Sequence, residues 1–157
     1  MTFIADAMLG RLARWLRLLG FDVLYDASWD DATIARAAAA GGRVVLTRDH
    51  ALLQRRLVRE GLLVDSDDLG AQLRQVLRFT GPPDPALMFS RCAVCNTPVV
   101  PASAAEVAGT VPPFVLRHRA QFVRCTGCGR VYWPGTHRER ALAELRRMIG
   151  APENAPL

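Results

Sequence analysis

The stretch Thr2-Phe-Ile-Ala-Asp-Ala-Met-Leu-Gly-Arg-Leu-Ala-Arg-Trp-Leu-Arg-Leu-Leu-Gly20 decides the fold that the sequence predicts. Its first residues, Thr2–Ala5, form a short apolar run that is typical of a buried strand. The segment Met8–Leu19 then repeats apolar side chains at helical spacing, and Gly20 can end that helix. The acid Asp6 stands between the two segments. The stretch therefore predicts a strand–helix unit with a carboxylate at its turn.

The same strand–helix order recurs along the next sixty residues. We predict strands at Val23–Tyr25, Arg43–Thr47 and Leu62–Val64, and helices at Asp31–Ala40, Ala51–Arg59 and Leu69–Phe79. Strands that alternate with helices are typical of a parallel sheet covered by helices on both faces. Residues 1–80 are therefore predicted to form a three-layer α/β domain with a short parallel sheet.

A break follows this domain. Gly81-Pro-Pro-Asp-Pro85 cannot continue a helix, so we predict a linker over residues 81–90. The pairs Cys92-Ala-Val-Cys95 and Cys125-Thr-Gly-Cys128 come after it. Two such pairs can surround one Zn²⁺ ion with four thiolates, which leaves no open position, so the site is structural rather than catalytic.

The cysteine pairs define a second predicted unit, a small zinc ribbon over residues 91–150. Gly127 and Gly129 permit a sharp backbone at the second pair. Thr136 and Glu139 predict a capping box for a last helix at about Arg138–Ile149. A flexible tail is predicted over residues 151–157.

The charged residues are unusual because all 20 basic residues are arginine. A chain without lysine has neither the P-loop lysine nor a Schiff-base lysine, and a phospho-receiver domain normally needs one too. Residues 1–85 carry 11 arginines against 11 acids, whereas residues 86–157 carry 9 against 4. The net charge of +5 thus belongs to the cysteine-bearing half, which predicts a polyanionic partner.

The hydrophobic runs are short and are broken by arginine or aspartate, so no transmembrane helix is predicted. The start of the chain lacks the basic and apolar regions of a signal peptide. Clustered cysteines in a cytosolic protein bind metal more often than they form disulfides. We therefore expect a cytoplasmic, zinc-binding protein.

Aspartates follow every predicted strand of the first domain. Because the carboxyl ends of parallel strands share one edge, these acids should gather on one rim. Each acid alone could simply cap a helix, but a set of close carboxylates needs a cation, and oxygen ligands suit Mg²⁺ or Mn²⁺. Such ions catalyse phosphodiester cleavage. The acids of the rim are Asp6, Asp26, Asp30, Asp31, Asp49 and Asp65.

Several motifs together resemble one known family. They are the opening stretch, Val45-Leu-Thr-Arg-Asp49, the two cysteine pairs and Tyr132-Trp-Pro-Gly-Thr-His137. Over about residues 3–148 the chain is similar to the ribonuclease domain at the C-terminus of eukaryotic mutator-seven exonucleases, which also occurs as a stand-alone prokaryotic protein. The resemblance implies a PIN-like nuclease with a C-terminal zinc ribbon, and metal-dependent hydrolysis of RNA.

The resemblance also implies which acids act. Asp6 and Asp49 match the metal-binding aspartates of PIN domains, and Asp31 matches the acid that opens the second helix, with Asp30 as the alternative. A fourth acid is left open. Its candidates are Asp65, Asp67 and Asp68.

The arginine-rich C-terminal half suggests how RNA is held. Arginine binds phosphate and aromatic rings stack on bases. Phe122 and Tyr132 are assigned to the ribbon core, and Arg17 is expected to face solvent. The residues predicted to contact RNA are Arg11, Arg14, Arg48, Arg130, Trp133, His137 and Arg138.

Two hypotheses follow. The first is a metal-dependent ribonuclease that cleaves single-stranded RNA, with a zinc ribbon that assists binding. The second is a non-catalytic nucleic-acid-binding module whose acids only cap helices, which predicts salt-dependent RNA binding without turnover.

Overall fold

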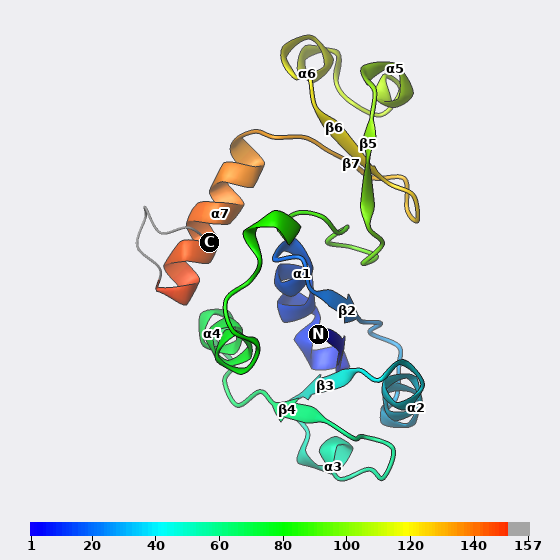
Figure 1. Ribbon diagram of the computed structural model, residues 1–157, viewed down its shortest axis with the longest axis vertical. Helices are drawn as coiled ribbons and strands as arrows, with labels where there is room; N and C mark the ends of the chain where they lie inside the picture. Colours follow the sequence, from blue (N-terminus) through cyan, green and yellow to red (C-terminus); the bar gives the residue numbers. More distant parts are fainter. Residues whose placement is uncertain (151–157) are drawn as a thin grey trace.

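The computed structural model describes residues 1–150, which form two sheets. The larger sheet has four parallel strands in the order β2-β1-β3-β4, and the smaller has three antiparallel strands in the order β5-β6-β7. Figure 1 shows the larger sheet at one end of the molecule and the smaller one, with α5 and α6, toward the other. The predicted α/β class with a small C-terminal unit is confirmed. The tail predicted over 151–157 lies outside the described residues.

The elements follow the predicted order as far as α4. The first half contains β1 (Thr2–Ala5), the 3₁₀ turn η1 (Ala7–Leu9), α1 (Gly10–Leu18), β2 (Asp22–Leu24), α2 (Asp31–Gly41), β3 (Val44–Thr47), α3 (His50–Leu53), β4 (Gly61–Leu63) and α4 (Leu69–Thr80). The second half contains η2 (Pro85–Leu87), β5 (Val99–Ala102), α5 (Ala104–Val107), α6 (Pro113–His118), β6 (Phe122–Cys125), β7 (Val131–Tyr132) and α7 (Thr136–Ile149). Within these residues no helix is long and apolar enough to span a bilayer.

Helices cover both faces of the parallel sheet. Phe3 and Leu46 point to the face covered by α1 and α4, while Ile4 and Val45 point to the face covered by α2 and α3. This alternation follows from the two-residue period of a strand. Every residue of β3 is buried, as expected of a central strand between two helical layers.

The helix predicted over Ala51–Arg59 is wrong in its length, because α3 ends at Leu53. Leu52 and Leu53 pack into the core beneath it, but one turn further along stand Arg55 and Arg56. Leu57, which a continued helix would place one turn after Leu53, is 45% exposed, so this turn buries little of the apolar surface that a short helix needs to persist. The chain turns instead, and Val58 donates a backbone hydrogen bond of 2.9 Å to Arg55.

The capping box predicted at Thr136 and Glu139 does not form. Thr136 is already the first residue of α7, and the preceding Gly135 takes the cap position without a side-chain bond. The structure places a capping box at α5 instead, where Ser103 and Glu106 bond each other's backbone. The same sequence pattern occurs in both places, and the start of the helix decides which one is used.

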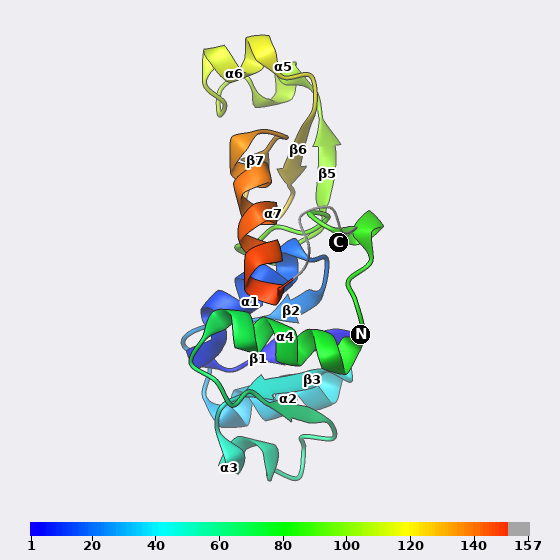
Figure 2. The same cartoon turned by 90° about the vertical axis from the view of Figure 1, so that its left-hand side faces the viewer.

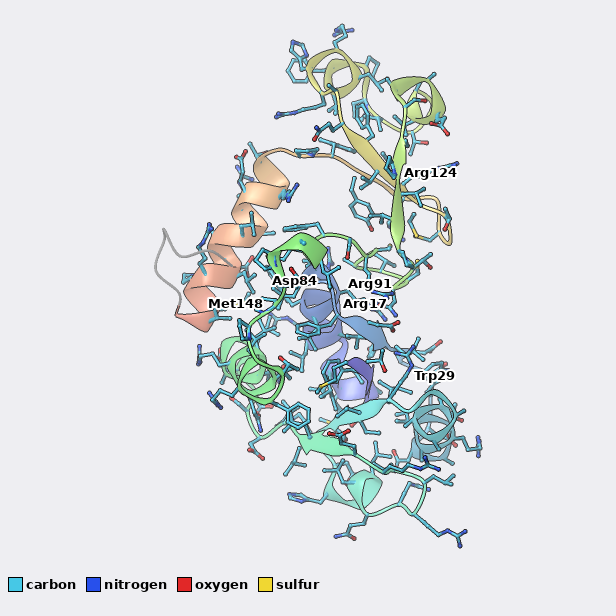
Figure 3. The ribbon with its side chains drawn as sticks, viewed as in Figure 1. Arg17, Trp29, Asp84, Arg91, Arg124 and Met148 are labelled. Carbon is cyan, nitrogen blue, oxygen red and sulfur yellow. The ribbon has the colours of Figure 1, made fainter. Side chains whose placement is uncertain are left out.

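The last helix returns to the parallel sheet. Figure 2 shows α7 running down from the smaller sheet to lie beside α4, and the two helices pack together. Leu145 of α7 is 2% exposed within the core formed by α1 and α4, and Met148, labelled in Figure 3, packs at its edge. The predicted domain boundaries at residues 80 and 90 stay a prediction, but α7 contributes to the core of the first unit.

We expect Leu145→Ala to lower the free energy of unfolding by about 2–5 kcal/mol, because the substitution leaves a cavity in this core. Urea unfolding followed by circular dichroism measures the change. The control is Arg140→Ala on the exposed face of the same helix, which should change it by less than about 0.5 kcal/mol. Equal effects of the two substitutions would contradict the packing of α7 on this core.

Candidate functional site

The strand order puts a topological switch point at the carboxyl edge of the parallel sheet, the place where open α/β sheets form a ligand crevice. The chain leaves β1 toward β2 on one side and later returns to β3 on the other side of β1. Ligands of open α/β sheets bind at such a switch point, outside the carboxyl ends of the two central strands. Asp6 directly follows β1, and Asp49 lies two residues after β3. The two predicted metal-binding aspartates therefore flank the crevice.

Thr47 connects these two acids. Its hydroxyl donates a hydrogen bond of 2.8 Å to Asp6 Oδ2 and accepts one of 2.9 Å from the backbone N–H of Asp49. Thr47 is fully buried and Asp6 is 8% exposed. The backbone N–H of Asp6 also donates to Leu46, which extends the pairing of β1 with β3 by one residue. Asp6 is thus held rigidly at the mouth of the crevice.

The acids at the start of α2 have other partners. Asp30 caps the helix, since its carboxylate accepts a bond of 2.8 Å from the Thr33 backbone N–H. This hydrogen bonding by Thr33 lowers the pKa of Asp30 below its ordinary value. Asp31 forms an ion pair of 3.2 Å with Arg55, which follows α3. Of the two, Asp31 is the one whose carboxylate is not used for capping.

The candidates for a fourth acid are spread along the loop before α4. Asp65 accepts from Gln75, Asp67 pairs with Arg48, and Asp68 caps α4 through the Ala71 backbone N–H at 2.8 Å. Asp68 therefore plays the ordinary capping role that aspartate has at a helix start.

The donor chemistry of the crevice suits a hard divalent cation. Asp6 and Asp49 each keep one carboxylate oxygen without a hydrogen-bond donor from the described residues. However, no three carboxylates among residues 1–150 lie within 4.8 Å of one another. The acids share an edge and offer the oxygen ligands that Mg²⁺ or Mn²⁺ prefers, but their side chains do not form a closed cage. Their assignment as catalytic residues stays a prediction.

Arg11 lies at the start of α1, beside this edge. It lines a cleft of about 340 Å³ that opens between the starts of α1 and α4 and the end of α7. Arg74 and Arg147 line the same cleft, as do the acids Asp67 and Asp68. The cleft thus mixes both signs of charge rather than presenting a uniform basic surface.

The four cysteines form the second candidate site, and here the side chains do converge. All four sulfur atoms lie within 4.8 Å of one another. Cys92 and Cys128 are 3.6 Å apart, and Cys95 and Cys125 are 3.3 Å apart. Four sulfurs around one Zn²⁺ at about 2.3 Å would be separated by about 3.8 Å, so the cluster fits a tetrahedral site. The predicted set of four metal ligands comes together in the fold.

The surroundings act on the four sulfur atoms in different directions. The Thr97 hydroxyl, 3.4 Å from Cys95, lowers the pKa of Cys95 to about 6, whereas burial raises the pKa of Cys125 to about 11. The Tyr132 hydroxyl lies 3.0 Å from Cys92 Sγ and can donate to that sulfur. Bound zinc would offset the mutual repulsion of four thiolates.

The predicted roles of the two glycines at the second cysteine pair have different causes. Gly129 has a φ of +75°, the left-handed conformation that glycine adopts most easily. At Gly127 a side chain has no room, because a Cβ atom would lie 2.5 Å from Thr97 Oγ1. Both glycines therefore let the chain wrap tightly around the sulfur cluster.

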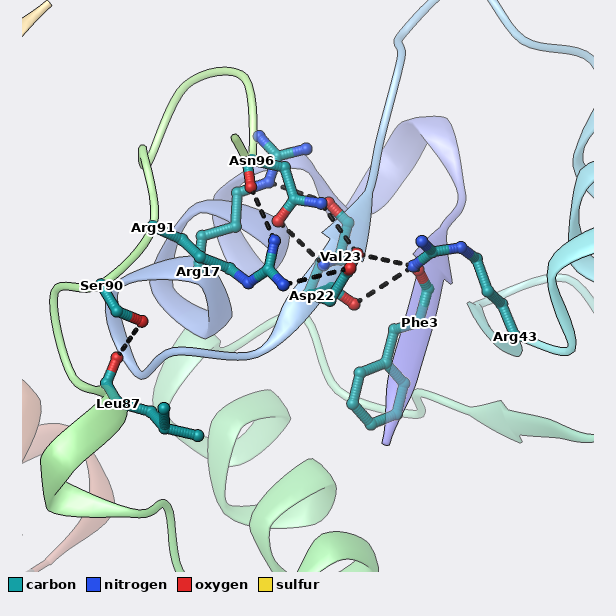
Figure 4. Close-up of polar contacts among 9 residues, drawn as sticks. All are labelled: Phe3, Arg17, Asp22, Val23, Arg43, Leu87, Ser90, Arg91 and Asn96. Atoms are coloured by element: carbon teal, nitrogen blue, oxygen red, sulfur yellow. Dashed lines mark hydrogen bonds and ion pairs between the residues drawn. The ribbon is translucent and has the colours of Figure 1, made fainter. Parts of the chain in front are cut away.

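Asn96, which directly follows the first cysteine pair, is bonded to the edge of the parallel sheet, as Figure 4 shows. The Val23 N–H of edge strand β2 donates to Asn96 Oδ1 at 3.1 Å, and the Val23 carbonyl accepts from Arg17 Nε at 2.9 Å. Arg17 also donates to the carbonyls of Ala93 and Val94, at 3.3 and 2.7 Å. The turn that carries Cys92 and Cys95 thus closes an open sheet edge.

The expectation that Arg17 faces solvent is wrong. Its side chain is only 4% exposed, and burial lowers its pKa from the ordinary value. Its charge is balanced by the cysteine cluster and by Asp22. The reason for its burial is that three carbonyl groups from β2 and the cysteine turn point to its guanidinium.

Asp22 is the acid at the centre of this junction. It accepts bonds from Arg43 at 2.7 Å and from Asn96 at 2.9 Å, and it pairs with Arg91 at 3.2 Å. Burial tends to raise its pKa, but these hydrogen bonds and the two arginine charges outweigh burial, so the pKa of Asp22 is lowered. The Asp22 carboxylate of β2 therefore contacts both Arg43, which precedes β3, and Arg91, which precedes the first cysteine.

The residues predicted to contact RNA occupy varied places. Arg130 lies 3.8 Å from Cys128 Sγ, Arg138 stacks over the Phe89 ring at 4.6 Å, and Trp133 packs edge-on to Phe122 at 6.5 Å. Phe122 is buried and Tyr132 half-buried in the second unit, as predicted. Arg14 is exposed on α1. The side chain of His137 lies outside the part that the structure describes. Contact of these residues with RNA stays a prediction.

These features together define an α/β domain with an acidic switch-point crevice and an attached four-cysteine unit. Comparison with protein families agrees, since the model of the Mut7-C RNAse domain matches residues 1–145. The chain belongs to the Mut7-C RNAse domain family, which confirms the resemblance drawn from its motifs. Comparisons with curated proteins and with solved structures give no match.

Removal of zinc should loosen the edge of the sheet as well as the cysteine unit. We expect chelation, or Cys125→Ser, to speed hydrogen exchange of the Val23 amide, because the turn that presents Asn96 loses its metal. NMR-detected exchange measures this change, with metal content from a colorimetric zinc assay. The Val64 amide, bonded to Thr47 at 2.7 Å next to the opposite edge strand, is the internal control. Equal exchange of Val23 with and without zinc would contradict the coupling.

Arg17→Met should lower the free energy of unfolding by about 1–3 kcal/mol, because it leaves buried carbonyl groups without a donor. Arg14→Met is the matched control, since Arg14 is exposed on the same helix, and it should change stability by less than about 0.5 kcal/mol. Urea unfolding of the zinc-loaded proteins compares the two. A loss for Arg17→Met no larger than that for Arg14→Met would argue against this bridge.

Proposed function

We propose that this chain is a metal-dependent ribonuclease that hydrolyses phosphodiester bonds of single-stranded RNA in the cytoplasm. The reaction takes place at the carboxyl edge of the parallel sheet, with Asp6, Asp31 and Asp49 as catalytic acids. The observation that carries the proposal is the linkage of Asp6 and Asp49 through Thr47 at the switch point, in a chain of the Mut7-C RNAse domain family.

The roles of the residues follow from their contacts. Thr47 fixes the orientation of Asp6 and of the Asp49 backbone, so that both carboxylates present an oxygen to the crevice. Asp6 and Asp49 would hold Mg²⁺ or Mn²⁺, which supplies a Lewis acid for water activation and leaving-group stabilisation. Asp31, balanced by Arg55, completes the acidic edge. Without a cation the edge repels the RNA backbone by its charge.

The four-cysteine unit supports this reaction without entering it. Zinc on Cys92, Cys95, Cys125 and Cys128 has a closed set of ligands, so its role is structural. The unit adds arginines to a domain that has no net charge over its first 85 residues. Arginine binds phosphate with a planar pair of donors, which suits RNA of any sequence.

The direct test is cleavage of a labelled single-stranded RNA with Mg²⁺ or Mn²⁺. We expect Asp6→Asn and Asp49→Asn each to slow cleavage by more than about 100-fold, since loss of groups that only support metal ligands already costs about 10- to 100-fold. Denaturing gels measure the rate. An unchanged rate in either variant would show that the assigned site is wrong.

The matched control for this test is Asp84→Asn. Asp84, labelled in Figure 3, caps the short turn η2 far from the acidic edge, and asparagine caps equally well. The same chemical change at this position should leave the rate within about twofold of the original. A large loss there would mean that the rates report folding rather than chemistry.

One observation favours a second candidate function. Asp30, Asp49 and Asp68 all cap helices, which is the role expected if the acids have no catalytic part. The chain would then be a non-catalytic nucleic-acid-binding module. RNA binding that weakens with salt, with no cleavage under any divalent ion, would support this function over the first.

A further inference from the structure

The α5–α6 segment carries an aromatic surface that the nuclease domain does not use. It lies between β5 and β6, and its inner side is closed by Val107, Val111 and Phe122. Phe114, on the outer side of α6, is 64% exposed. A single exposed apolar side chain does not by itself indicate a ligand, so the residues around Phe114 decide what this surface can bind.

Phe114 does not stand alone on this surface. The ring of His118, one helical turn later, lies over it with a centroid distance of 4.2 Å and an interplanar angle of 30°. His118 Nδ1 is also 2.8 Å from the Phe114 carbonyl, which fixes the imidazole ring. Two rings are thus held in contact at the surface, tilted by 30°, and their exposed faces can stack with a further aromatic group.

The charge around the two rings favours a polyanion. Residues 99–125 contain Arg117, Arg119 and Arg124, and their one acid is Glu106. The Glu106 carboxylate accepts bonds of 2.7 and 2.8 Å from the Ser103 backbone and hydroxyl, so it serves as a cap. Arginines beside exposed aromatic rings are the combination that binds single-stranded nucleic acid, with bases on the rings and phosphates on the arginines.

The place of α6 in the molecule fits a strand that also reaches the acidic edge. Figure 2 shows α6 at the far end of the long axis from the parallel sheet. In that view β2 and β3 point to the left, and α6 lies on the left as well. RNA engaged at the carboxyl edge can therefore run along the same side of the molecule, past α7, to α6.

We propose that Phe114 and His118 form a stacking platform for unpaired bases of RNA, with Arg117 and Arg119 holding the adjoining phosphates. The proposal rests on the proposed function in that it takes the same RNA as ligand. It predicts that a short single strand binds the platform alone, whereas a long one can occupy both the platform and, once a divalent ion is bound there, the acidic edge.

The test is equilibrium binding of fluorescein-labelled oligouridines of increasing length, measured by fluorescence anisotropy with the full zinc-loaded chain and no added Mg²⁺ or Mn²⁺. We expect Phe114→Ala to raise Kd by about 5- to 150-fold for long oligonucleotides, the loss that corresponds to one stacked base. Because the acidic edge without a cation repels RNA, short oligonucleotides also depend on the platform and should lose affinity for Phe114→Ala as well. An unchanged Kd for long oligonucleotides would overturn the platform.

Two comparisons separate stacking from other causes. Phe114→Leu keeps an apolar side chain but removes the ring, so it should lose binding as Phe114→Ala does, while Phe114→Trp should retain it. Full binding by Phe114→Leu would overturn the proposal in favour of an apolar docking surface. The matched control is Phe79→Ala on α4, where the ring is 37% exposed on another part of the molecule; it should leave Kd unchanged.

The binding assay stands apart from the cleavage assay. If the chain cleaves no RNA but Phe114→Ala still weakens binding, the nuclease function fails and the platform is supported. If the chain cleaves RNA while Phe114→Ala alters neither Kd nor KM, the platform is overturned and the nuclease function stands. Unchanged thermal unfolding and zinc content of each variant ensure that a loss of binding is not a loss of fold.

Discussion

The buried guanidinium of Arg17 is the interaction on which the rest of the structure depends. It joins α1, edge strand β2 and the turn of the first cysteine pair through three carbonyl groups. An arginine can do this because its planar fork has five donors, whereas a lysine ammonium has three on a single atom. Burial of the charge is costly, and the neighbouring cysteine cluster and Asp22 offset that cost. The charge of Arg17 is therefore balanced only when Asp22 of the first unit and the cysteines of the second unit are both beside it.

This junction also solves a problem of the parallel sheet. The outer side of β2 would present the unpaired N–H and carbonyl groups of an edge strand, which proteins commonly cover. Here Asn96 and Arg17 take up both groups of Val23. The cysteine unit is thus a cover for the α/β domain as well as an appendage to it. The second unit contacts the α/β domain at another place as well, because Leu145 of α7 packs into the core beside α1 and α4.

Much of the fold could be predicted from local patterns. Period-two and helical spacing of apolar residues identified the four strands and the helices of the first half, because burial on one face is what those patterns record. The length of α3 could not be predicted, since a strong run of helix-forming residues continues beyond Leu53 while its apolar face does not. The cysteine ligands were predictable from spacing alone, because two short pairs leave few other geometries.

The parts that were missed are those that depend on contacts distant in sequence. Arg11, Arg14 and Arg17 are evenly spaced, yet six residues do not return to the same face of a helix with about 3.6 residues per turn, so Arg17 need not share the exposure of Arg11. Arg17 instead lies one helical turn after Ala13, which is buried. The four-residue spacing from an apolar residue could have indicated that Arg17 lies on the buried face of the helix. Asn96 and Asp22 bond each other although they lie more than seventy residues apart in the sequence, and no local pattern indicates this contact. Phe114 stands in no motif of the sequence, whereas Trp133 does, although the Trp133 ring packs against Phe122 inside its own unit.

The junction at Val23 connects the acidic part of the molecule with its arginine-rich part. The acids collect where strands of the first unit end, while the arginine excess belongs to the second unit. A ligand that contacts both surfaces is held most precisely when the two units keep a fixed position relative to each other. The bonds at Val23 supply that relation, and β2 then leads directly into the loop that delivers Asp30 and Asp31. The strand that the cysteine unit holds is therefore the strand that leads to part of the acidic edge, so a metal ion on the four cysteines would also stabilise the position of Asp30 and Asp31.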